Sequence, residues 1–111
     1  MILYHNPRCS KSRQALALLE QQAQPITVRL YMSEPLSQSE LLDLLKALDL
    51  SAHELARSNE SAFKAAGLQQ ASSEELIEAM LQDPRLIERP IFQVGTRAVV
   101  GRPPERVLEL L

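Results

Sequence analysis

The first 31 residues read as a strand, a helix and a second strand. "MILY" (residues 1–4) is a short apolar run that stops before an Asn-Pro pair, which is typical of a buried strand. Residues 10–22 carry apolar side chains at helical spacing and contain no proline or glycine, so they predict a helix. "ITVRLY" (residues 26–31) is rich in β-branched side chains and predicts a strand. A strand, helix and strand in this order predict parallel, right-handed pairing.

The middle of the chain has capping and apolar patterns that predict several helices. Three times a serine is followed three residues later by a glutamate, which is the capping box that starts a helix. The pairs are Ser37 with Glu40, Ser51 with Glu54, and Ser72 with Glu75. The first box precedes a stripe of leucines, and the last precedes an apolar stretch that stops at Asp83-Pro84. A further short helix is expected between Asn59 and Gly67, with these two residues capping its ends.

The last part of the chain predicts a hairpin and a final helix. "PIFQV" and "RAVV" are short strands on either side of "GT", and Pro103-Pro104 should open a helix with Val107, Leu110 and Leu111 facing inward. The whole order matches an α/β, thioredoxin-like fold: a mixed four-stranded sheet (βαβ…ββα) with a helical insertion. We expect one domain over residues 1–111, with the insertion at about 36–84.

Composition narrows the functional class. The 111 residues, 45% of them hydrophobic, suffice for one core, and a net charge of −2 argues against a general nucleic-acid or membrane-surface binder. No apolar run spans a bilayer, and the N-terminus does not resemble a signal peptide. The single cysteine excludes an internal disulfide and any metal site built on paired cysteines. We therefore expect a cytoplasmic protein without a metal.

That cysteine stands in an unusual setting, "YHNPRCSKSR" (residues 4–13). A lone cysteine is more often a small buried hydrophobe, but this one follows a polar, cationic loop at the start of a helix. Unpaired backbone N–H groups and the partial positive charge of a helix N-terminus favour a thiolate and can bind an oxyanion. A protonated His5 would add to this effect, and Arg13 follows Cys9 by one helical turn. Cys9 is therefore a candidate nucleophile.

Three arginines could complete an anion site. Arg57 follows a short capped helix, Arg89 precedes Pro90 before the third strand, and Arg102 precedes Pro103 after the fourth. Taken singly, each would ordinarily be a solvated surface charge. In a thioredoxin-like fold, however, the loop before the third strand lies beside the cysteine, and its proline commonly follows a cis bond. Arginine is also well suited to planar recognition of tetrahedral oxyanions.

The chain resembles the glutaredoxin-dependent arsenate reductase (ArsC) family over nearly its whole length. "YHNPRCSKSR" is similar to the family's His-Asn-Pro-x-Cys-x-x-Ser-Arg motif, and "LYMSEPLS", "LARSNESAFKAAGL", "RLIERPIF" and "VVGRPPERVLELL" resemble its later blocks. The resemblance implies a thioredoxin-like fold and reduction of arsenate to arsenite at one cysteine. It also implies glutathione as co-substrate, glutaredoxin as electron-donating partner and no bound cofactor.

The resemblance also implies roles for individual residues. Cys9 matches the attacking nucleophile and His5 the histidine that helps to activate it, while Ser12 and Arg13 match the end of the same motif. The residues that match the oxyanion-binding arginines are Arg57, Arg89 and Arg102. The chain ends at Leu111, without the extension of the longer plasmid-type enzymes. It therefore looks closer to the short, chromosomally encoded members, for which arsenate need not be the everyday substrate.

Two other functions remain open on the sequence. A sister branch of the fold family regulates transcription by binding RNA polymerase and often carries a Cys-x-x-Cys redox switch. Here Ser12 takes the second position, so an internal disulfide is impossible, and the arginine set favours the enzyme. A general glutathione-linked thiol oxidoreductase would share the cysteine site but not the oxyanion. The expected partners are arsenate, glutathione and glutaredoxin, with no nucleic acid or membrane, and the expected state is a monomer.

Overall fold

The computed structural model describes residues 1–111, which form two compact units. The first, the sheet unit, consists of Met1–Glu34 and Arg89–Leu111. The second, the helical unit, is Pro35–Glu88, and it contains the range at which the sequence predicts a helical insertion. None of the helices in either unit combines the length and the apolar character that crossing a membrane requires.

The sheet unit contains a mixed four-stranded sheet with the order β2-β1-β3-β4. The strands are β1 (Ile2–Tyr4), β2 (Thr27–Arg29), β3 (Ile91–Val94) and β4 (Arg97–Val100). As predicted, β1 and β2 are parallel, while β3 pairs antiparallel with both β1 and β4. β2 is shorter than the predicted strand over residues 26–31, because the backbone N–H of Tyr31 turns back to donate to the carbonyl of Arg29 (3.1 Å). The thioredoxin-like fold is confirmed.

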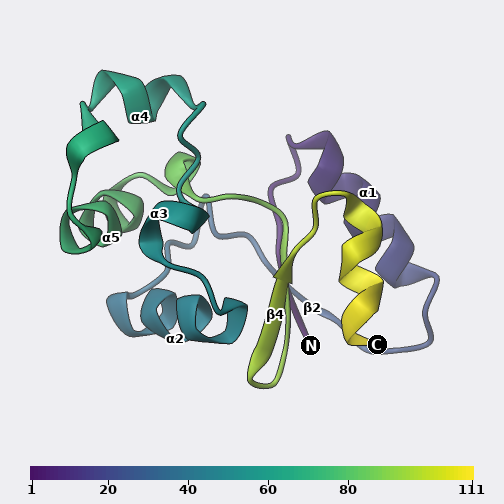
Figure 1. Cartoon of the computed structure of the whole chain (residues 1–111). Helices are drawn as coiled ribbons and strands as arrows, with labels where there is room; N and C mark the ends of the chain where they lie inside the picture. The colour runs from purple at the N-terminus through teal and green to yellow at the C-terminus, as the bar shows by residue number, and fades with distance from the viewer. The chain divides into compact units, whose positions relative to one another are not determined.

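Two helical elements cover one face of this sheet. The α-helix α1 (Ser10–Glu20) and the C-terminal 3₁₀ helix η3 (Pro104–Leu110) lie side by side (Figure 1). Between them and the sheet lies a core of fully buried side chains: Leu3, Ala15, Leu19, Phe92 and Val107. This core anchors α1, which begins directly after the cysteine, against the sheet.

The C-terminal element differs from the prediction in one respect. Val107 is buried and Leu110 packs against the core, as expected, but Leu111 is 46% exposed. A 3₁₀ helix has about three residues per turn, so positions 104, 107 and 110 share one face and position 111 falls outside it. The inward orientation of Leu111 was wrong because the pattern was interpreted with α-helical spacing.

The helical unit contains six short elements. They are α2 (Gln38–Leu48), α3 (Ala52–Leu55), α4 (Ser61–Ala65), η1 (Leu68–Gln70), α5 (Ser73–Gln82) and η2 (Pro84–Leu86). All three predicted capping boxes are present, each with both of its reciprocal hydrogen bonds. Leucine side chains of α2 and the apolar face of α5 form the buried interior of this unit.

The short helix α4 corrects one predicted cap. Gly67 follows the helix with φ of 66°, in the left-handed conformation that favours glycine, as expected for its C-terminal boundary. At the other end the N-cap is Glu60 rather than Asn59, and it makes no side-chain cap. The backbone N–H of Glu60 donates to the carbonyl of Arg57 (3.0 Å), so a turn over residues 57–60 delays the start of the helix.

Candidate active site

Four loops of the sheet unit meet at one end of the sheet, where strands begin or stop. In the strand register Tyr4 lies opposite Arg29 on one side and Ile91 on the other, and Ile91 lies opposite Val100. One end of the sheet therefore contains the last residues of β1, β2 and β4 and the first residues of β3. This arrangement brings the Cys9 loop, the loop after β2, the Arg89-Pro90 dipeptide and the segment after β4 together.

Cys9 is the N-cap residue of α1. Its backbone is extended (φ −97°, ψ 123°), its carbonyl accepts from the N–H of Arg13 (3.0 Å), and its N–H donates to the carbonyl of Asn6 (3.0 Å). No side chain caps α1, so the backbone N–H groups of its first turn have no side-chain acceptor at the N-cap. The side chain of Cys9 is largely buried, with 8% exposure of the residue. The predicted position of Cys9 at the start of a helix is confirmed.

Ser12 and His5 hold the loop that precedes Cys9. The N–H of Asn6 donates to Ser12 Oγ (3.0 Å), and Ser12 Oγ shares a hydrogen bond of 2.6 Å with His5 Nδ1. The N–H of His5 donates to the carbonyl of Arg29 at the end of β2 (2.9 Å). Ser12 and His5 are both buried. Their contacts fix the path of the chain from the end of β1 to the start of α1.

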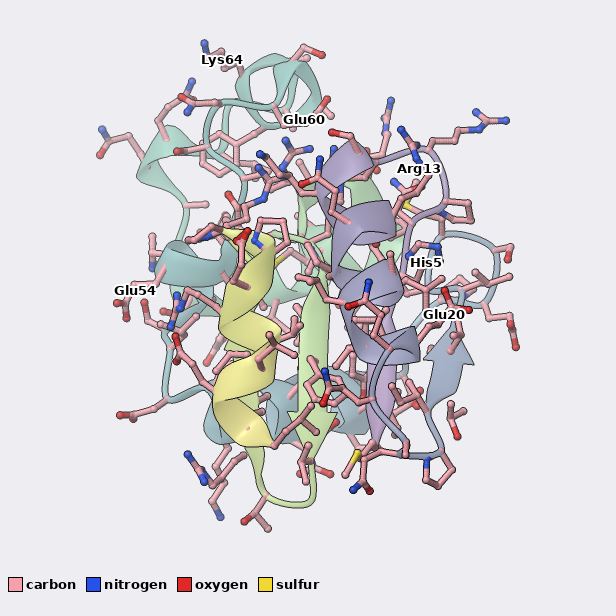
Figure 2. The ribbon with its side chains drawn as sticks, turned by 90° about the vertical axis from the view of Figure 1, so that its right-hand side faces the viewer. His5, Arg13, Glu20, Glu54, Glu60 and Lys64 are labelled. Atoms are coloured by element: carbon pink, nitrogen blue, oxygen red, sulfur yellow. The ribbon has the colours of Figure 1, made fainter.

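The surroundings of His5 favour its neutral form. Burial lowers its pKa below the ordinary value of 6.5, the positive charge of Arg13 lowers it further, and Glu20 opposes this shift. Figure 2 shows His5 and Arg13 on the same side of α1. The lowered pKa favours the uncharged imidazole at neutral pH, which argues against His5 as a source of positive charge near Cys9. The side chain of His5 instead forms a hydrogen bond with the hydroxyl of Ser12.

Arg13 is engaged with the same loop. Its Nη1 donates to the carbonyl of Pro7 (2.8 Å), which lies before the start of α1. A second local contact, from the N–H of Arg8 to Asn6 Oδ1 (3.0 Å), tightens the turn between them. The guanidinium of Arg13 therefore braces the cysteine loop and carries positive charge on the side of α1 that holds His5.

Arg102 is the arginine that the structure places at the sulfur. Its Nη2 donates to Cys9 Sγ at 3.8 Å, and its Nε donates to the backbone carbonyl of Arg89 at 2.7 Å. The second contact orients the guanidinium and leaves its other edge toward the cysteine. A guanidinium held in this way attracts negative charge on the sulfur or on a group bonded to it.

The Arg102 loop packs tightly on the Arg89-Pro90 dipeptide. The Arg89–Pro90 peptide bond is cis, as predicted, and the Arg102–Pro103 bond is also cis. The N–H of Gly101 donates to the carbonyl of Pro90 (2.8 Å). A Cβ atom at Gly101 would lie 2.9 Å from Pro90 Cγ, closer than side chains normally approach. Sequence reasoning missed Gly101, although its position between a strand and an Arg-Pro pair was a usable signal.

Arg89 carries buried donors that lack an acceptor. Its Nε and Nη1 atoms are buried, and neither has a hydrogen-bond partner. Leaving such donors unsatisfied is costly, and buried polar groups in folded proteins are nearly always paired. An oxyanion would satisfy one of these donors, because guanidinium groups bind tetrahedral anions through pairs of parallel N–H groups and Nε and Nη1 belong to different pairs.

Arg57 belongs to the helical unit, whereas the other predicted site residues all belong to the sheet unit. Its Nη1 lies 2.8 Å from Glu60 Oε2 and its Nε lies 4.0 Å from Glu88 Oε2. Its N–H donates to the carbonyl of Leu86 (2.7 Å). These carboxylates, which no sequence motif indicated, orient the guanidinium within its own unit. A role for Arg57 in binding an oxyanion stays a prediction.

The fold and the cysteine define a class. A mixed four-stranded sheet of this order, with a cysteine at the start of the helix after β1, is that of a thioredoxin-like protein. Within that class the chain belongs to the ArsC family, whose family model matches residues 4–110.

Two relatives and one solved structure agree with this chain in length as well as in sequence. The uncharacterized protein YfgD of Escherichia coli (strain K12) is 46% identical over 98% of this chain and 94% of its own length. An arsenate reductase of Haemophilus influenzae is 43% identical over 100% of this chain and 98% of its own. Among solved structures, an arsenate reductase from Vibrio cholerae superimposes with a TM-score of 0.94 at 43% identity, covering 99% of this chain and 96% of that one.

Proposed function

We propose that this protein reduces arsenate to arsenite, with Cys9 as the nucleophile, glutathione as co-substrate and glutaredoxin as electron donor. The observation that carries the proposal is the guanidinium of Arg102 at 3.8 Å from the Cys9 sulfur. It is supported by the unpaired buried donors of Arg89 and by relatives that are named arsenate reductases. A tetrahedral oxyanion suits this combination of a nucleophile and planar cationic donors.

In the first step the thiolate of Cys9 attacks arsenic. A sulfur–arsenic bond forms, an arsenic–oxygen bond breaks, and the oxygen leaves as hydroxide that is protonated to water. Arg102 and Arg89 would bind the remaining oxygens, and the backbone N–H groups at the start of α1 would add further donors. Donors held in place before the reaction stabilise the developing charge without reorganisation, which is usually the largest contribution to such catalysis. Arg57 is a predicted third arginine of this site.

The second step needs an external thiol, because the chain has one cysteine. The glutathione thiolate attacks the Cys9 sulfur and forms a disulfide bond. The sulfur–arsenic bond breaks, and its electron pair stays on arsenic, which changes from arsenic(V) to arsenic(III) and leaves as arsenite. A glutaredoxin thiolate then attacks the glutathione sulfur of the mixed disulfide and releases the Cys9 thiolate. No step forms an intramolecular disulfide.

His5, Ser12 and Arg13 are positioning residues in this proposal. Their contacts run to one another, to the backbone of the cysteine loop and to the end of β2. They hold Cys9 at the start of α1, so that the sulfur, the helix N-terminus and Arg102 share one location. An error of about 1 Å in such an arrangement is enough to lower the rate about 100-fold.

The test is an arsenite-release assay with the purified protein, glutathione and glutaredoxin. We expect turnover that requires both donors and is abolished by Cys9→Ser. Mass spectrometry of protein trapped during turnover should show one glutathione bound to Cys9. Full turnover with thioredoxin in the absence of glutathione would contradict the route, and no arsenite under any donor would contradict the substrate.

A further inference from the structure

A pocket of about 310 Å³ lies beside the cysteine loop, within the sheet unit. Residues 5–8 form one wall, and Leu30, Met32 and Ser33, which follow β2, form the other. We call this the β2-side pocket. Its volume is at the lower end of the range of about 300–1,000 Å³ that is typical of small-molecule sites. In the proposed steps the lining residue His5 positions the cysteine loop, and no substrate occupies this pocket.

The strand order places the pocket and two arginines of the sheet unit, Arg89 and Arg102, on opposite sides of β1. The sheet order is β2-β1-β3-β4, and the cysteine loop follows β1. The β2-side pocket is formed with the loop after β2. Arg89 precedes β3 and Arg102 follows β4, so both belong to the other side of β1. A ligand held by the arginines and a ligand held in the pocket would therefore flank the cysteine from two directions.

The chemistry of the second step calls for such an arrangement. Displacement at sulfur proceeds in line, with the attacking thiolate opposite to the leaving atom, and depends on aligned reacting atoms. When arsenic is bonded to Cys9 on the arginine side, the attacking thiol must approach from the side of β2. That is the side on which the pocket lies.

The lining of the pocket fits glutathione. Arg8 offers an exposed cation for one of the two carboxylates of this tripeptide. Leu30 and Met32, which are 36% and 37% exposed, offer apolar surface for its methylene groups. We propose that the β2-side pocket binds glutathione and directs its thiol toward the Cys9 sulfur from the side opposite to arsenic. This inference rests on the proposed function for the direction of attack.

The pocket can be tested without arsenate, through the reaction of Cys9 with glutathione disulfide. The Cys9 thiolate attacks one sulfur of this disulfide, keeps that glutathione in a mixed disulfide and releases the other as glutathione thiolate. Arg8→Gln should lower the rate of mixed-disulfide formation about tenfold, as expected for the loss of one charge-assisted hydrogen bond. Ser33→Phe, at an exposed position of the lining, should lower it by obstructing the pocket.

Two controls separate recognition from reactivity. Lys11→Gln removes the same charge close to Cys9 but outside the pocket lining, and it should leave the rate within about twofold of wild type. Hydroxyethyl disulfide, which is small and uncharged, should react equally with every variant. Equal slowing by Arg8→Gln and Lys11→Gln, or equal slowing toward both disulfides, would overturn the pocket assignment. Because arsenate is absent, failure of the arsenate assay would leave this result intact.

Discussion

Arg102 lies 93 positions after Cys9, and its Nη2 donates to the Cys9 sulfur at 3.8 Å. The contact depends on the hairpin of β3 and β4, which returns the chain to the end of the sheet at which β1 stops. It also depends on the carbonyl of Arg89, which accepts from Arg102 Nε at 2.7 Å and sets the orientation of the guanidinium.

Replacing this guanidinium should affect arsenate chemistry strongly. We expect Arg102→Ala to lower kcat/KM for arsenate about 100-fold, the usual effect of removing one donor from an oxyanion site. Arg102→Lys should restore only part of the loss, because an ammonium has the charge but not the planar pair of donors. The control is Arg97→Ala, at an exposed position on β4. An Arg102→Ala enzyme as active as the Arg97→Ala enzyme would contradict the assignment.

Gly101 should be required for the position of Arg102. A Cβ atom there would lie 2.9 Å from Pro90 Cγ and 3.0 Å from Val107 Cγ1. We expect Gly101→Ala to cost about 1–3 kcal/mol of stability through overpacking and also to lower kcat/KM for arsenate by displacing the arginine. Urea unfolding and steady-state kinetics measure the two effects.

Gly95→Ala is the matched control for this substitution. Gly95 has φ of 61° in the turn between β3 and β4, and apart from its chain neighbours no residue has an atom within 4 Å of the position that a Cβ would take there. Alanine there should cost stability through backbone strain alone and leave kcat/KM unchanged. If Gly101→Ala lowered stability without lowering kcat/KM, Gly101 would serve only the packing of the loop.

The neutral His5 should make stability depend on pH. Burial and Arg13 lower its pKa in the folded protein below the ordinary value of 6.5, so the unfolded chain binds the proton more readily. Stability should therefore decrease as the pH falls below about 6.5 and the unfolded state becomes protonated. His5→Asn, which offers a polar atom near the position of Nδ1 but does not titrate, should lack this component.

Urea unfolding between pH 7 and pH 5 measures the difference in stability between wild type and His5→Asn. The lowered pKa values of Glu54 and Glu75, which accept hydrogen bonds from their capping serines, affect stability at lower pH and equally in both proteins. We expect the stability advantage of wild type over His5→Asn to shrink as the pH falls. An advantage that grew toward pH 5 would mean that folding raises the pKa of His5.

The capping boxes should contribute measurably to the helical unit. Ser72 accepts from the N–H of Glu75 (3.2 Å), and its own N–H donates to Glu75 Oε1 (3.0 Å). Ser72→Ala should cost about 1 kcal/mol in urea unfolding. Ser73→Ala removes the neighbouring hydroxyl, within the first turn of α5 but outside the box, and should change stability by less than about 0.5 kcal/mol. Equal effects of the two substitutions would argue against the cap.

Local sequence determined much of this protein, because the interactions concerned join residues a few positions apart. Each capping box pairs a serine with a glutamate three residues later, and all three formed as predicted. The parallel pairing of β1 with β2 and the hairpin of β3 with β4 followed from strand patterns and connection lengths. The setting of Cys9 at the start of α1 needed only the loop before it and the helical pattern after it.

Only the tertiary structure decided what surrounds the sulfur. The contact of Arg102 with Cys9, the crowding at Gly101 and the burial that keeps His5 neutral all depend on segments far apart in sequence. The folding of the helical unit places the carboxylates of Glu60 and Glu88 beside the guanidinium of Arg57. Distance, packing and desolvation are properties of neighbours in space, and residue order alone does not supply them.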